Sequence, residues 1–197
     1  MPGASRPRVE GDREEEILAA TIELLLEVGY DRLTMDAVAK QARASKATLY
    51  RRWESKPRLV VEALARAKSS PQVQEQDTGS LRGDLVATFC GHEGLGQVGT
   101  EVLGSVVTAL ATDPDFAAEF REAFIAPKVA VTRGIYERAR ERGEIAACVD
   151  LDIVGPALAG ILMHRLFVLG LPTDEATVRK VIDHVILPAV QHPPVAS

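Results

Sequence analysis

The chain has 197 residues, of which 46% are hydrophobic and 26% charged, and its net charge at pH 7 is −5. This composition can support a buried core and is that of an ordinary soluble protein. We find no run of about 18 apolar residues and no apolar stretch in residues 1–16, so we expect neither a membrane span nor a secretory signal.

The two cysteines, Cys90 and Cys148, are far apart in the chain and lack the spacing of metal ligands. This usage predicts a reduced, cytoplasmic protein, and a disulfide between them is the less favoured alternative.

Taken in chain order, apolar residues recur at helical spacing, which predicts an all-α protein of about nine helices. Gly29 is expected to end the first helix, Thr34 and Ser45 to be N-caps of the second and third, and Pro57 to lie in the first turn of the fourth. These four helices are predicted at residues 12–28, 34–42, 45–53 and 56–68.

Residues 69–80 are polar and rich in turn formers, which predicts a domain boundary there. An N-terminal domain of 12–68 and a C-terminal domain of 81–191 follow, flanked by a disordered arm at 1–11 and a frayed tail at 192–197. Five more helices are expected at 81–90, 95–112, 114–142, 150–169 and 173–190, with a kink at Pro127 and stops at Gly143 and Gly170.

The basic residues are concentrated in the predicted N-terminal domain. Residues 40–68 contain nine Lys or Arg and two Glu, a net charge of +7, whereas residues 69–197 contain ten basic and seventeen acidic residues. A basic module joined to an acidic body indicates a nucleic-acid-binding surface, and the alternative is a solvated charged surface.

The helices at 34–42 and 45–53, separated by a short turn, predict a helix-turn-helix. At about 100° per residue, Trp53 lies about 40° from Leu49, so both side chains face the core, and Ala47 and Arg51 lie on the opposite side. That outward face suits a helix in the major groove, with Arg51 able to make a bidentate contact with guanine.

The segments Leu33–Ala39 and Ser45–Lys56, after a helix at Ile17–Tyr30, resemble the tetracycline-repressor (TetR) family of bacterial regulators. The resemblance is motif-specific over residues 12–68 and rests on helical pattern elsewhere. It implies a homodimeric repressor that binds a palindromic DNA operator and is released by a small-molecule effector in the C-terminal domain. It implies DNA contacts at Thr34, Lys46, Ala47, Thr48, Tyr50, Arg51, Arg52 and Lys56.

One position departs from the family pattern. Arg43 stands in the turn where the family usually has glycine, and an arginine at positive φ costs on the order of 1 kcal/mol. The turn is therefore expected to be strained or to differ in geometry, and contact of Arg43 with a phosphate is an open alternative.

Two surfaces of the C-terminal domain are candidates for binding. A pocket between helices, suited to a neutral or weakly polar hydrophobic ligand, is expected to involve Phe89, Leu103, Val107, Leu110, Phe120, Phe124 and Lys128, although each could equally be plain core. Arg121, Lys128 and Arg133 on the long helix leave open a ligand with an anionic group. Wide apolar stripes on the last two helices predict a four-helix dimer interface of Leu158, Ile161, Leu162, Arg165, Leu166, Val178, Val181, Ile182 and Val185.

We find no motif of a metal site or of an enzyme's cofactor site in the sequence. His92, His164, His184 and His192 have no metal-ligand spacing, and the glycines from Gly91 to Gly99 follow no predicted strand, which argues against a dinucleotide loop. We therefore expect no metal, cofactor or catalytic site. Two other functions remain open: a regulator controlled by a protein partner without a pocket, and a helical small-molecule-binding protein or enzyme with no DNA role.

Overall fold

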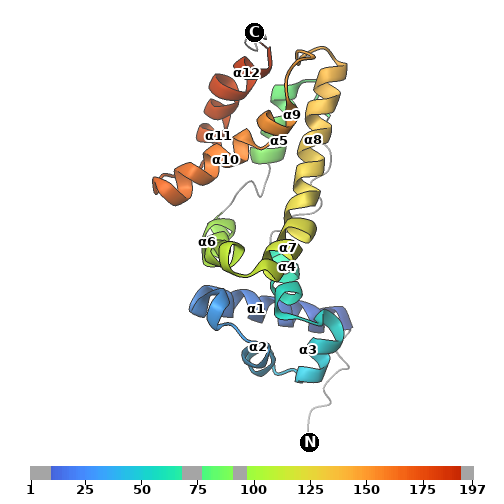
Figure 1. The fold of residues 1–197 in the computed structure, drawn as a ribbon, viewed down its shortest axis with the longest axis vertical. Coiled ribbons are helices and arrows are strands. Elements are labelled where there is room, and N and C mark those ends of the chain that lie inside the picture. Colours follow the sequence, from blue (N-terminus) through green and yellow to red (C-terminus); the bar gives the residue numbers. More distant parts are fainter. Residues whose placement is uncertain (1–9, 68–76, 91–96, 192–197) are drawn as a thin grey trace, which may run out of the picture. The chain divides into compact units, whose positions relative to one another are not determined.

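The computed structural model describes residues 10–67, 77–90 and 97–191, with side chains from residue 11 and, in the last stretch, from residue 104. Every regular element in these ranges is helical, as predicted (Figure 1). Taken as continuous runs, with the one-turn α9 joined to α10, they form nine helices. Most of the predicted arm, most of the 69–80 boundary, the glycines at 91–96 and the tail at 192–197 lie outside the described residues.

The first of two compact units contains the helix-turn-helix and is built on a core shared by six helices. Predicted helix signals are confirmed at three places: Gly29 has a φ of 75°, and the side chains of Thr34 and Ser45 accept hydrogen bonds from the amides of Ala37 and Thr48. Its elements are α1 (Glu10–Arg32), α2 (Met35–Gln41), α3 (Lys46–Trp53), α4 (Lys56–Ala67), most of α6 (Gln97–Thr112), α7 (Pro114–Glu119) and the π-helical turn η1 (Phe120–Ile125).

The structure groups residues 101–124 with the first four helices, whereas the sequence boundary assigned them to the C-terminal domain. Tyr30, at the end of α1, explains the difference. Its hydroxyl donates to Asp113 Oδ2 at 2.9 Å, and its ring lies 4.3 Å from that of Phe116 between centroids. Asp113 in turn caps α7 by accepting a hydrogen bond from the Phe116 amide. The hydrogen bond alone joins residues 83 positions apart, so no local pattern in the sequence indicates these contacts.

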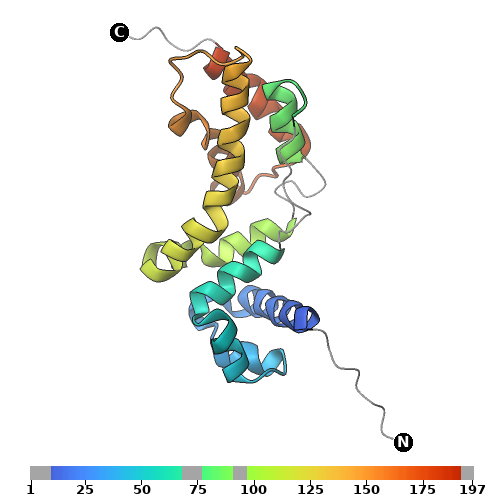
Figure 2. The ribbon, with the colours of Figure 1, turned by 90° about the vertical axis from the view of Figure 1, so that its right-hand side faces the viewer.

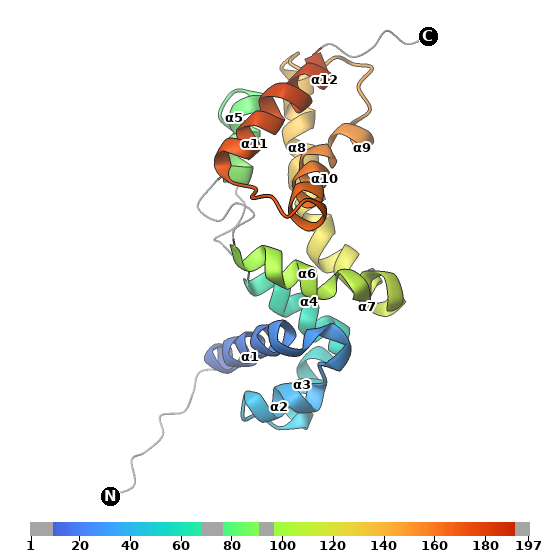
Figure 3. The ribbon, with the colours of Figure 1, turned by 90° about the vertical axis from the view of Figure 1, so that its left-hand side faces the viewer.

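The second unit is an independent helical assembly with its own buried core (Figure 3). Helix α5 packs against α8 and α11, and α10 packs against α11. The predicted stops at Gly143 and Gly170 are confirmed, since both have positive φ. Its elements are α5 (Leu81–Cys90), α8 (Ala126–Glu141), α9 (Leu151–Val154), α10 (Ala157–Met163), η2 (His164–Val168), α11 (Glu175–Val181), η3 (Ile182–Ile186) and α12 (Leu187–Gln191).

Two prolines inside long helices each follow a π-helical turn. Pro127 comes after η1 and Pro188 after η3. Proline has no N–H to donate and its ring clashes with the carbonyl four residues earlier, so a locally widened turn before it relieves both problems. The irregularity predicted at Pro127 therefore takes the form of a π turn within a helical run from Pro114 to Glu141.

One stretch, Leu151–Val168, is long and apolar enough to cross a membrane by length and composition, with a mean hydropathy of 1.5. A search of the sequence for uninterrupted apolar runs does not find this stretch, because Asp152 and Arg165 lie within it. Only 17% of it is buried inside the chain. A single such stretch is weak evidence for a membrane span, and an apolar helix left exposed by its own chain also fits a contact between protein subunits.

A buried carboxylate connects the start of α5 to the end of α8. The Asp84 side chain is fully buried and accepts hydrogen bonds from the Thr78 amide at 2.6 Å and from Arg142 Nη2 at 3.1 Å. Burial alone would raise the pKa of this carboxyl, but the bonds from Thr78 and Arg142 outweigh it and hold the pKa below its usual range. This carboxylate should therefore stabilise the second unit in its ionised form.

We expect Asp84→Asn to lower the free energy of unfolding by about 2 kcal/mol at pH 7, because buried donors lose their charged acceptor. The wild-type contribution should be complete above the unfolded pKa of about 4 and be lost as pH falls through the lower folded pKa. Urea unfolding at several pH values measures both. Asp183→Asn is the control, since Asp183 pairs with Arg82 at the surface, where such pairs contribute little. Equal losses in both variants would contradict the role assigned to Asp84.

Candidate nucleic-acid interface

Helices α2 and α3 lie against each other at one end of the first unit and form the predicted helix-turn-helix (Figures 1 and 2). Arg43 in the turn between them has a φ of 52°, so of the two alternatives the turn keeps a left-handed residue at this position. Its amide donates to the Lys40 carbonyl at 3.2 Å, and its own carbonyl accepts from Arg13 Nη2 on α1. The turn therefore keeps the geometry that glycine normally supplies, and α1 helps to hold it.

The buried side of α3 is the one that the helical angles predicted. Leu49 has no exposed surface and Trp53 is 2% exposed, so both belong to the core. Ala47, Tyr50 and Arg51 are exposed on the other side. Among the described residues Arg51 has no ion-pair or hydrogen-bond partner, so its guanidinium is available to an external acceptor.

The residues predicted to hold phosphates lie near the start of each helix. Thr34 is exposed, and because its oxygen accepts the α2 capping bond its O–H remains able to donate. Thr48 is half-buried, with its hydroxyl 2.8 Å from that of Ser45. Lys46 is exposed but forms an ion pair with Asp36 of α2, so a phosphate would have to compete with that carboxylate.

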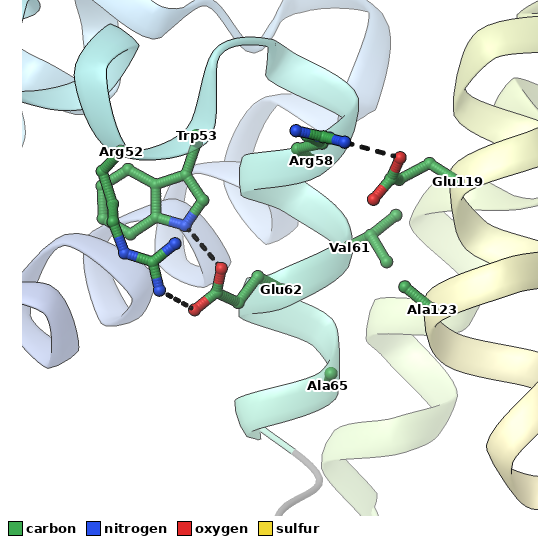
Figure 4. Close-up of a pocket in the computed structure, with 8 residues that line it drawn as sticks. All are labelled: Arg52, Trp53, Arg58, Val61, Glu62, Ala65, Glu119 and Ala123. Carbon is green, nitrogen blue, oxygen red and sulfur yellow. Dashed lines mark hydrogen bonds and ion pairs between the residues drawn. The ribbon is translucent and has the colours of Figure 1, made fainter.

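Arg52, which we predict to contact DNA, makes several contacts within its own unit (Figure 4). Its guanidinium donates to Glu14 at 2.8 Å and to Glu62 at 3.1 Å and lies over the Trp53 ring, 5.3 Å from the centroid. Glu62 also accepts from Trp53 Nε1 at 2.9 Å. Sequence reasoning missed both glutamates, since Glu14 and Glu62 are separated from Arg52 by 38 and 10 positions.

Lys56 is also engaged within the unit. Its Nζ donates to the Tyr30 carbonyl at 3.2 Å and lies 3.9 Å from the centroid of the Tyr30 ring. The ammonium group therefore stabilises the partial negative charge of a carbonyl near the end of α1 and joins α1 to the start of α4. This contact gives Lys56 a structural task that the sequence did not indicate.

An open groove of about 360 Å³ lies beside Arg52, between α3, α4 and the α7–η1 segment (Figure 4). Arg58 on α4 forms ion pairs with Glu54 at 2.7 Å and with Glu119 on α7 at 3.6 Å. The charged side chains of the groove thus connect the end of α3 to α4, and α4 to α7. Its lining consists of Arg52, Trp53, Arg58, Val61, Glu62, Ala65, Glu119 and Ala123.

The residues predicted to line an effector pocket are divided between the two units. Phe120 and Phe124 are each 3% exposed and stack in the first core, with centroids 4.8 Å apart, and Val107 is 47% exposed. Leu110 packs at the edge of the same core, Phe89 is half-buried in the second unit, and Lys128 is exposed. The side chain of Leu103 lies outside the described residues.

Most of the residues predicted for the dimer interface lie inside their own chain. The sequence showed wide apolar stripes but not which half of each stripe faces inward. Leu158, Leu162, Val178, Val181 and Ile182 are buried in the second core, whereas Ile161, Arg165 and Leu166 are half-buried and Val185 is exposed. The exposed apolar side chains of these helices include Met163, Phe167, Val168 and Val185.

Two family models match this chain. Residues 17–63 match the model described as bacterial regulatory proteins, tetR family, and residues 75–185 match the tetracyclin repressor-like C-terminal domain. The second match covers more than half of the chain.

Similar proteins agree with both matches. The HTH-type transcriptional regulator Rv1556 of Mycobacterium tuberculosis is 38% identical over 180 residues, which cover 90% of this chain and 88% of that protein. The DNA-binding transcriptional repressor TetR of Mycobacteroides abscessus is 34% identical over 89% of this chain and 92% of that protein. The crystal structure of the TetR family transcription regulator SCO0332 aligns with a TM-score of 0.63 and 30% identity, over 90% of this chain and 96% of that one.

The conformation of Arg43 leads to a stability prediction. Arg43→Gly should raise the free energy of unfolding by up to about 1 kcal/mol, because glycine adopts positive φ without the steric cost that arginine has. Lys40→Gly, within α2, is the control and should lower it by about 1 kcal/mol. Chemical denaturation measures both, and a loss of stability in Arg43→Gly would show that the arginine side chain outweighs the strain.

Proposed function

The chain belongs to the TetR family of DNA-binding transcription regulators, and on that premise we propose that it is a cytoplasmic homodimeric repressor that a small-molecule effector releases from a palindromic operator. The proposal that the chain recognises DNA rests on the outward face of α3. Ala47, Tyr50 and Arg51 are exposed there, opposite the buried Leu49 and Trp53.

The three outward side chains suit different parts of a major groove. Arg51 has the planar donor pair that guanine accepts, and since it has no partner among the described residues it is the residue most able to read a base. Ala47 is small enough to allow the helix close approach or to touch a thymine methyl. Tyr50, at the helix edge and 49% exposed, can donate to a phosphate.

Phosphate contacts would come from groups around this face rather than from all the basic residues of the +7 segment. Thr34 and Lys46 are exposed at the starts of α2 and α3. Arg52 and Lys56 remain secondary candidates, since a contact with DNA would require each to give up the internal partners described above. We therefore assign Arg52 and Lys56 mainly to holding α3 and α4 in position.

Release by an effector requires that a change elsewhere reach α3. Within the first unit a chain of contacts is available: Glu119 of α7 pairs with Arg58 of α4, and Glu62 of α4 holds Arg52 and Trp53 of α3. The same helical run continues from α7 through η1 into α8 of the second unit. A displacement of α7 would thus act on α4 and through it on the angle of the DNA-reading helix.

We expect Arg51→Ala to relax sequence preference, with a loss of about 1–3 kcal/mol on the operator and little change on unrelated DNA. Lys46→Ala should weaken binding to every sequence and reduce the salt slope by about 1, because one phosphate contact is lost. The measurement is fluorescence anisotropy with DNA upstream of the chain's own gene, and with scrambled DNA, at several salt concentrations.

Selection from random DNA completes the experiment if the upstream DNA shows no preference. Failure to select any sequence would overturn the regulator proposal. Equal losses on specific and scrambled DNA in Arg51→Ala would show that this arginine contacts phosphates rather than a base.

The homodimer is proposed on the exposed apolar side chains of α10, η2 and η3. Helix α10 packs beside α11 and η3 (Figure 3), so Met163, Phe167 and Val185 belong to neighbouring elements of one unit. These three side chains are 43%, 37% and 44% exposed in the single chain. A second copy related by two-fold symmetry would bury such a surface against itself. The apolar segment Leu151–Val168 would then be covered by a second protein chain rather than by lipid.

We expect Phe167→Glu combined with Val185→Glu to give a folded monomer with much weaker operator binding, as measured by analytical ultracentrifugation and anisotropy. Leu162→Glu is the contrasting variant and should unfold the unit instead, because Leu162 is 1% exposed in its own chain. An intact dimer in the double variant, at concentrations near those of the wild type, would place the interface elsewhere.

The competing function within the same family is control by a protein partner without a small molecule. Thermal-shift screening separates the two, because an effector that binds the folded chain raises its stability. The alternative of an enzyme or carrier without a DNA role is not supported, since the matching families and relatives are transcription regulators.

A further inference from the structure

Among the described residues of the second unit, two buried hydroxyl groups lack hydrogen-bond partners. Tyr136 of α8 is fully buried, and its hydroxyl contacts no donor or acceptor among the described residues. Thr88 of α5 is half-buried, but its Oγ1 is buried and equally without a partner. A buried hydroxyl without a hydrogen bond costs about 1–3 kcal/mol, so two of them in one small core require an explanation.

The two hydroxyls lie on helices that pack against each other, α5 and α8. At one end of this pair the Leu81 amide donates to Glu144 at 2.8 Å, which shows that the start of α5 lies beside the end of α8. From there the helices run antiparallel. Thr88 lies seven residues along α5 from Leu81, about two helical turns, and Tyr136 lies five residues before Glu141, the last residue of α8, roughly one and a half turns.

Both residues also lie on the faces that these helices bury. Leu81, Asp84 and Leu85 form the buried face of α5, and Thr88 continues it at the same spacing. On α8 the buried residues are Ile135, Tyr136 and Ala139. The apolar side chains that pack around this core nearby include Val86, Phe89 and Val131.

We propose that Tyr136 and Thr88 are the polar contacts of the effector site, and that the effector is an uncharged, mainly apolar molecule bearing one hydroxyl or carbonyl oxygen. This inference rests on the proposed function and names the chemistry of its ligand. An oxygen placed between the two hydroxyls would satisfy both, and the apolar surroundings would bury the rest of the molecule. A charged ligand would lose its hydration in such an apolar core, which costs more than burying an uncharged one.

The protonation state of Tyr136 agrees with an uncharged ligand. Burial raises the pKa of its hydroxyl to about 12, so the group keeps its proton at neutral pH and can donate to a carbonyl or hydroxyl oxygen.

The first test compares phenol with toluene, two probes of similar shape that differ in a single hydroxyl. We expect wild-type protein to bind phenol about tenfold more tightly than toluene, measured by isothermal titration calorimetry, and the double variant Tyr136→Phe, Thr88→Val to lose that preference. Absence of phenol binding, or an unchanged preference in the double variant, overturns the proposal.

A second measurement needs no probe. In the ligand-free protein, Tyr136→Phe and Thr88→Val should each raise the melting temperature, because each removes a hydroxyl that has no partner. Tyr30→Phe is the control and should lower it, since that hydroxyl donates to Asp113. A lower melting temperature in Tyr136→Phe would show that the hydroxyl is already satisfied in the unliganded core, which contradicts the proposal.

Measuring operator binding tests the proposed regulator function separately from the proposed effector site. Both variants keep the α3 surface, so they should bind the operator as the wild type does. If wild-type protein selects no DNA sequence but prefers phenol through these hydroxyls, the regulator proposal fails and the ligand site stands.

Discussion

The burial of Leu49 and Trp53 sets the orientation of α3, and the whole DNA-reading surface depends on it. With those two side chains in the core, this helix of eight residues turns Ala47, Tyr50 and Arg51 outward on the opposite side. Glu62 strengthens the constraint because it accepts from the Trp53 indole while holding Arg52. Rotation of α3 would therefore break a buried packing contact and two charge-assisted or polar bonds together.

Acidic residues divide the basic segment into two groups with different tasks. Arg52 and Arg58 lie among Glu14, Glu62 and Glu119, so much of their charge is used to join helices of the first unit. Arg51 has no such partner among the described residues. The local net charge of +7 is thus a poor measure of how many cations DNA can use, and the affinity of the surface depends on the unpaired ones.

In each of the last two helical runs, one part of the apolar stripe packs in the core of its own chain and another part remains exposed. Leu162 and Ile182 lie in the second core, whereas Phe167 and Val185 on the same stretches of chain remain exposed. Stripes wider than one core needs are typical of helices that pack on both sides. In the same unit, the core between α5 and α8 leaves the Thr88 and Tyr136 hydroxyls without partners among the described residues.

The sequence by itself determined the helical class, the break at Gly29, the N-caps at Thr34 and Ser45 and the outward face of α3. All of these are local, because caps, φ preferences and helical angles involve residues a few positions apart. Only the tertiary structure decided that residues 101–124 join the first unit, that Arg52 faces acidic partners and that Leu162 lies inside its own chain. Those outcomes depend on contacts between residues far apart in the chain, and periodicity shows that a face is apolar without showing what covers it.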